Sequence, residues 1–100
     1  MENGLDGYRK LSRMSGFSLE EIVGNCIALI KVGEHAGKIG ILVNSFVEKS
    51  DNIYLIAIKE KNRKKVVRIN AGNFLEDDPE NYVYCSINSS YILEELRLFQ

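Results

Sequence analysis

Basic side chains crowd residues 59–68, and they are the strongest candidates in this chain for chemistry with a ligand. The members are Lys59, Lys61, Arg63, Lys64, Lys65 and Arg68. On a hairpin with Asn62 and Arg63 near its tip, these cations could contact phosphates, because each contact releases counterions and makes binding salt-dependent. The same composition is typical of a solvated hairpin whose lysines keep edge strands from pairing with other chains. Contact with nucleic acid or a partner and simple solvation both stay open.

Tyrosines elsewhere in the chain could assist nucleic-acid binding. Tyr54, Tyr82 and Tyr84 offer aromatic faces on which unpaired bases could stack. The same residues also fit the core or the rim of a β-fold, and we favour that interpretation.

A separate loop is acidic. Residues 76–80 contain the four acids Glu76, Asp77, Asp78 and Glu80. They lack the regularly spaced oxygen ligands and the glycine of a calcium-binding EF-hand loop. We expect a solvated loop or an acidic contact surface, with no bound metal and no cofactor.

Catalytic constellations are missing from the sequence. His35 is the one histidine, and its only acidic neighbour in the sequence is Glu34. A general base needs a nucleophile or an orienting acid, and there is no Ser-His-Asp order, nucleophile elbow or phosphate loop. We predict that the chain is not an enzyme. The remaining catalytic alternative is a small-barrel ribonuclease toxin that uses an arginine or an acid on a strand face.

The two cysteines indicate a reducing environment. Cys26 and Cys85 each stand alone in an apolar stretch, as buried small side chains do. With one histidine they cannot complete a structural zinc site. No apolar run has the length of a signal peptide or a membrane span, so we expect a cytoplasmic protein with no membrane contact and no disulfide.

Composition and charge describe one globular domain. The 100 residues are 45% hydrophobic and 27% charged, with a formal net charge of −1. A protein held to nucleic acid mainly by its overall field is usually basic. Nucleic-acid binding would therefore depend on a local patch.

Hydrophobic periodicity predicts the elements that position these residues. Apolar, β-branched patterns predict strands at 26–32, 38–49, 52–60, 64–70 and 81–87. Helical signals appear around residues 8–14, at 19–23 behind the capping-box pair Ser18 and Glu21, and at 89–100. Five short strands with hairpin-length connections indicate a mainly β fold, a small antiparallel barrel or curled sheet.

Three glycines lie between the first two predicted strands. Gly33, Gly37 and Gly40 would let the chain fold back sharply, since glycine adopts positive φ and allows close backbone approach. Gly40 stands inside a predicted strand, where glycine usually marks a bend, a bulge or a tight contact. We predict a structural role for all three.

The segment around these glycines, CIALIKVGEHAGKIGILVNSFVE, resembles the KOW motif of some ribosomal proteins and of NusG/Spt5-type elongation factors. The glycine spacing and the apolar run 41–43 carry the resemblance, which extends more loosely over residues 24–76. It implies a five-stranded SH3-like barrel. KOW segments bind RNA in some proteins and protein partners in others.

Together these patterns predict three parts: an N-terminal extension at 1–17, an SH3-like, KOW-type barrel at 18–88 and a C-terminal helix at 89–100. Leu93, Leu96 and Phe99 form an apolar stripe on that helix, which would pack on the sheet, on a protein partner or in a homodimer. We expect a non-catalytic binding module that docks on a protein or ribonucleoprotein assembly, as a small regulator or inhibitor does. An RNA- or DNA-binding KOW protein of transcription or translation is the alternative.

Overall fold

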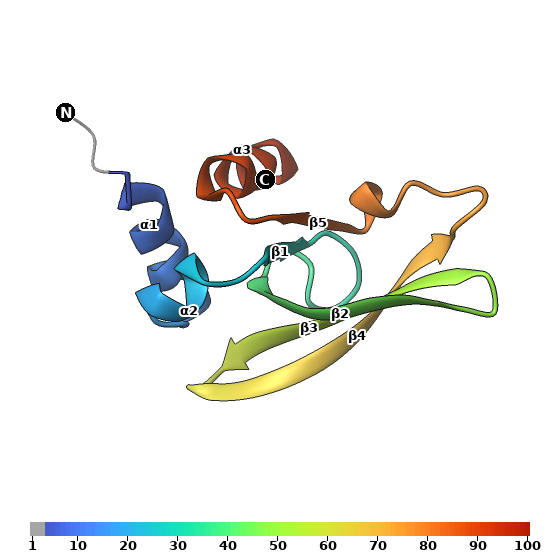
Figure 1. Cartoon of the computed structure of the whole chain (residues 1–100), viewed down its shortest axis with the longest axis horizontal. Coiled ribbons are helices and arrows are strands. Elements are labelled where there is room, and N and C mark those ends of the chain that lie inside the picture. The colour runs from blue at the N-terminus through green and yellow to red at the C-terminus, as the bar shows by residue number, and fades with distance from the viewer. Residues whose placement is uncertain (1–3) are drawn as a thin grey trace.

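The computed structural model describes residues 4–100, which form an antiparallel β-sheet with helices against one of its faces (Figure 1). The strand order is β4-β3-β2-β1-β5. The strands are β1 (Ile27–Ile30), β2 (Ile39–Glu48), β3 (Asp51–Glu60), β4 (Arg63–Asn73) and β5 (Val83–Ser86). The helices are α1 (Asp6–Ser15), α2 (Leu19–Val23), the 3-10 turn η1 (Pro79–Asn81) and α3 (Ser89–Phe99). The predicted mainly β fold with an N-terminal helical turn and a C-terminal helix is confirmed.

Tight two-residue turns connect the three long strands. Lys49 and Ser50 join β2 to β3, and Lys61 and Asn62 join β3 to β4, all four with positive φ. This geometry matches the right-handed twist of the strands on either side. The hairpin tip is therefore Lys61–Asn62, and Arg63 lies opposite Glu60 rather than at the tip.

Each face of the sheet is covered by its own hydrophobic core. The helix-side core joins residues of α1, α2 and α3 to the sheet: Leu11, Phe17, Ile22, Ile27, Leu29, Ile39, Ile41, Ala57, Ile92 and Leu96. The second core lies on the concave side and comes from strands alone: Ala28, Ile30, Ile56, Ile58, Val67 and Val83. Strand β1 contributes to both cores, which explains why it is buried along its whole length.

The sheet curls strongly, which brings its two edge strands to one core. Val67 of edge strand β4 and Val83 of edge strand β5 belong to the same concave core. Within residues 4–100, however, β4 and β5 do not pair with each other and are connected only through β3, β2 and β1. The architecture is an open, curled five-stranded sheet.

The three glycines lie where the chain turns from β1 into β2. Gly33 and Gly37 have φ of 81° and 90°, in the left-handed region that side chains disfavour. At Gly40 a Cβ atom would lie 2.3 Å from the backbone oxygen of Ala57. Gly40 pairs with Ala28, so it faces the concave core, where the backbone of β3 approaches most closely.

The N-terminal helices pack as part of the domain. Leu11 and Phe17, which lie within the predicted 1–17 extension, are buried in the helix-side core. Helix α2 begins at the predicted capping box, in which Ser18 accepts from the backbone of Glu21 and Glu21 accepts from the backbone of Ser18. None of the helices within residues 4–100 is long and apolar enough to cross a membrane.

Candidate functional site

Half of the predicted basic residues are engaged within the chain. Lys59 stacks on the ring of Phe17, with 5.2 Å from its amine to the ring centroid. Arg68 is ion-paired with Glu48 and lies over the ring of Phe46.

Glu60 neutralises part of the remaining basic charge. Its carboxylate accepts from the Lys38 amine at 2.5 Å and lies 3.6 Å from the Lys65 amine. The hydrogen bond from Lys38 and its charge hold the pKa of Glu60 below its usual value. Lys61, Arg63 and Lys64 are exposed, and none of the three has an ion-pair partner among the residues that the structure describes.

The three tyrosines pack against the cores, Tyr54 and Tyr82 against the concave core and Tyr84 against the helix-side core. Burial raises the pKa of Tyr54, and the neighbouring Cys85, Glu80 and Asp78 raise it further. Burial raises the pKa of Tyr84 as well, with Glu95 and Glu80 adding to the effect. The acids that act on these two tyrosines belong to the connection from β4 to β5 and to α3.

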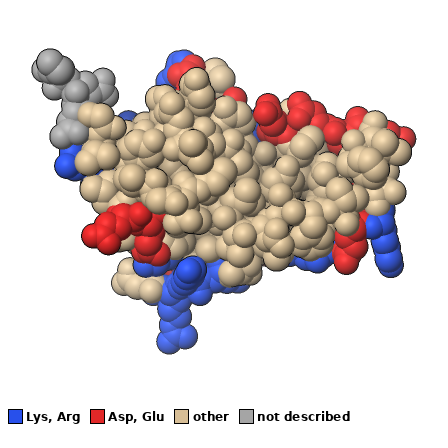
Figure 2. Space-filling view, viewed as in Figure 1, with Lys and Arg blue, Asp and Glu red and all other residues tan. Residues whose placement is uncertain are grey.

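Figure 2 shows how charge is distributed across the visible face. Acidic side chains gather along the upper right margin, over the connection from β4 to β5, and most basic ones along the lower margin, where smaller acidic groups also lie at the left and the right.

Helices α1 and α3 form a groove that brings distant parts of the sequence together. The helices touch near their first turns, where a Cβ on Gly7 would lie 2.4 Å from the Ser89 hydroxyl. Beyond this contact lies an open cavity of about 420 Å³. Its lining residues are Lys10, Met14, Ser90, Leu93, Glu94, Leu96, Arg97 and Gln100.

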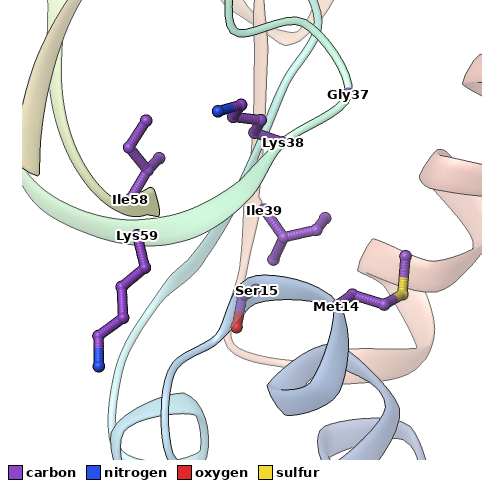
Figure 3. Close-up of a pocket in the computed structure, with 7 residues that line it drawn as sticks. All are labelled: Met14, Ser15, Gly37, Lys38, Ile39, Ile58 and Lys59. Atoms are coloured by element: carbon purple, nitrogen blue, oxygen red, sulfur yellow. The ribbon is translucent and has the colours of Figure 1, made fainter. Parts of the chain in front are cut away.

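A second cavity of about 190 Å³ also has Met14 in its lining. It is lined by Met14, Ser15, Gly37, Lys38, Ile39, Ile58 and Lys59. In Figure 3, Ile39 lies between α1 and the sheet, and the amines of Lys38, which precedes β2, and of Lys59 in β3 point away from Met14 in different directions. The two cavities, which share Met14 in their linings, are together called the α1–α3 groove below.

The predicted partner stripe on α3 is divided between core and surface. Leu96 is only 5% exposed and belongs to the helix-side core, because it follows the buried Ile92 by one helical turn. Leu96 therefore packs on the sheet, which is one of the alternatives that the sequence left open, and it contributes at most to the groove floor. Leu93 is half-buried in the groove, and Phe99 is 37% exposed beside Gly37.

Sequence reasoning missed the α1 side of the groove. Met14 is 45% exposed and Lys10 is exposed, and both face α3 across the cavity. Nothing in the local sequence links them to α3, because the two helices lie at opposite ends of the chain. The spacing of Lys10 and Met14, one helical turn apart, was the only available signal.

The groups with catalytic potential remain scattered. The His35 ring lies 3.6 Å from the Glu34 carboxylate. Burial raises the pKa of the Cys85 thiol to about 12, and the adjacent Cys26 adds to the shift, so Cys85 is a poor nucleophile at neutral pH. Within residues 4–100, no three His, Cys, Asp or Glu side chains gather as metal ligands.

Comparison of the chain with protein families, with curated proteins and with solved structures finds no match. The functional inference therefore starts from the geometry of this chain alone.

Proposed function

We propose that this chain is a non-catalytic binding module that docks on a protein or ribonucleoprotein assembly, as a regulator or an inhibitor would. The α1–α3 groove is the observation that carries the proposal. Open apolar grooves with a few polar groups at their rims are typical of binding sites. Met14 and Leu93 provide accessible apolar surface there, and Ser90 and Gln100 provide polar groups.

Two matched substitutions test the proposal. Met14→Glu places a charge in the groove, and Val66→Glu places the same charge on an exposed strand residue outside it. Each variant is immobilised, and the proteins retained from cells of the source organism are quantified by mass spectrometry. We expect a defined partner to be retained by the native chain and by Val66→Glu, and to be lost with Met14→Glu.

Two results would contradict the docking proposal. One is that no protein is retained by a chain whose circular dichroism shows it folded. The other is that the same proteins are retained whether or not residue 14 is charged.

The β3–β4 hairpin supports a second candidate, binding of RNA or DNA. Lys61, Arg63 and Lys64 are free to contact phosphates. Titration with generic single- and double-stranded nucleic acid at low and moderate salt separates the two functions. If the binding is tight, depends steeply on salt and is lost on charge reversal of Arg63 and Lys64, nucleic-acid binding replaces docking through the groove as the proposed main function.

We also propose that the curled sheet is an SH3-like barrel of the KOW type. The support is that the two edge strands share one core and that Gly33, Gly37 and Gly40 shape the turn from β1 to β2. Amide hydrogen exchange tests closure. In a closed barrel the β5 amides that point away from β1 exchange slowly, whereas rapid exchange there would contradict the assignment.

A further inference from the structure

We infer that the α1–α3 groove binds an acidic amphipathic helix of a partner protein. The inference rests on the proposed docking function and adds the chemistry of the partner.

The shape of the groove suits a helix. Helices α1 and α3 meet at Gly7 and Ser89, and the cavity between them extends as far as Met14 and Gln100. Leu93 and Leu96 are three residues apart on α3 and both line the cavity, where the half-buried Leu93 forms an apolar ridge above Leu96, which is only 5% exposed. A third helix can pack against such a ridge with its own apolar stripe.

Met14 makes the floor of the groove adaptable. It is 45% exposed in the free chain, and it is the residue that both cavities share. An unbranched thioether side chain can adjust to different apolar partners, and methionine is common at such surfaces. The floor therefore favours a partner helix with an apolar stripe. The residues at the rim of the groove determine which residues can flank that stripe.

The rim is cationic, although the whole chain carries a net charge of −1. The residues that line the two cavities include four cations and one acid: Lys10, Lys38, Lys59 and Arg97 against Glu94.

Internal ion pairs neutralise only part of this charge. Arg97 pairs with Glu94 at 2.5 Å, and Lys38 pairs with Glu60. Lys10 has no ion-pair partner among residues 4–100, and Lys59 contacts an aromatic ring rather than a carboxylate. A helix with carboxylates beside its apolar stripe complements this rim, and a basic helix is repelled by it.

The test uses synthetic peptides and the full-length, isotope-labelled chain. The probe is a helical peptide of roughly 18 residues with leucines at i, i+3, i+4 and i+7 spacing and glutamates on both flanks. The control peptide carries lysine at every glutamate position. We expect amide shifts in α1 and α3 on titration with the acidic peptide, and affinity about tenfold lower for the basic one, which corresponds to about 1.4 kcal/mol.

Matched variants of the chain separate the rim from overall charge. Lys10→Glu changes the rim, and Lys49→Glu makes the same change in the exposed β2–β3 turn. We expect Lys10→Glu to weaken the acidic peptide about fivefold and Lys49→Glu to leave its affinity within about twofold.

Three results would overturn the inference. The acidic peptide binds no better than the basic one, its shifts map outside α1 and α3, or sedimentation shows a dimer of the chain that Met14→Glu dissociates. If any of these results occurs while capture of a partner still depends on residue 14, the groove is still a docking site. Only the proposed acidic character of the partner helix is then wrong. If the peptide binds as expected and no partner depends on residue 14, the proposed function fails instead.

Discussion

Gly40 illustrates how one residue type can be required by the packing around it. Its position faces the concave core, where a Cβ atom would lie 2.3 Å from the Ala57 oxygen and 2.8 Å from an Ile56 methyl carbon. The nearest obstacle is backbone, so side-chain rotation cannot relieve the clash. Strand β3 would have to move away from β2.

We therefore expect Gly40→Ala to lower the free energy of unfolding by roughly 1–3 kcal/mol, the usual cost of overpacking. Urea denaturation measures the change. Gly4→Ala is the control, because a Cβ there meets nothing within 4 Å. Equal stability of the two variants would contradict the close approach at Gly40.

The Cys85 thiol predicts a dependence of stability on alkaline pH. Burial, with the neighbouring Cys26, raises its pKa from 9.0 to about 12 in the folded chain. The unfolded chain therefore loses this proton first, so the stability from the protonated thiol is complete below pH 9 and is lost progressively between pH 9 and 12. The raised pKa values of Tyr54 and Tyr84 act in the same direction at higher pH.

We expect the free energy of unfolding to fall as pH rises above 9, and to fall less steeply in Cys85→Ala. Urea denaturation of both proteins at several alkaline pH values makes the comparison. Identical slopes would show that the Cys85 thiol titrates normally in the folded chain.

At the scale of elements, α2 depends on its capping box. The helix has five residues, too few to be stable without tertiary contacts and caps. The Ser18 hydroxyl accepts from the Glu21 backbone at 3.2 Å, and the Glu21 carboxylate accepts from the Ser18 backbone at 3.2 Å. The bonds that the Glu21 carboxylate accepts from the Ser18 backbone and, at 3.1 Å, from the Ser18 hydroxyl hold the pKa of Glu21 below its usual value, with Lys59 and Lys64 contributing further.

Ser18→Ala is expected to destabilise the chain by about 1 kcal/mol, the typical cost of losing a cap. It also raises the pKa of Glu21 toward its ordinary value, because the hydroxyl donor is lost while the backbone donor remains. Urea denaturation and an NMR titration of the Glu21 carboxyl group measure the two effects.

Ser45→Ala, an exposed serine on β2, is the control for Ser18→Ala. If the Ser18 variant keeps both the native stability and the low pKa of Glu21, the capping box has no energetic role.

On the scale of the whole molecule, the helices and the sheet share one core. Leu11 of α1 is fully buried with Ile22 of α2, Ile92 of α3 and Ile27 of β1. We expect Leu11→Ala to cost about 2–5 kcal/mol and the chain to unfold in a single transition.

Leu98→Ala is the control, since Leu98 is 66% exposed on α3, and surface changes of this kind usually stay within about 0.5 kcal/mol. Denaturation followed both by circular dichroism and by tyrosine fluorescence shows how many transitions occur. Separate transitions for helices and sheet would show that α1 is a detachable extension.

The local signals in the sequence were sufficient for the elements. Alternating apolar residues predicted five strands, and the Ser18–Glu21 spacing predicted α2, because these patterns depend on neighbours within one or two turns. The β3–β4 tip was less predictable. Lys61 takes positive φ, which its residue type does not indicate, and strand register determines it instead.

The candidate site, in contrast, could not be predicted from local signals in the sequence. The sequence by itself determined a β-rich domain, the close-packed position of Gly40 and a helix at 89–100, since periodicity and residue size act locally. Only the tertiary structure decided that Lys10 and Met14 face Leu93, that Leu96 is buried and that the tyrosines lie beside the acids. These are contacts between residues far apart in the chain, and the way the sheet curls and the helices cross determines them.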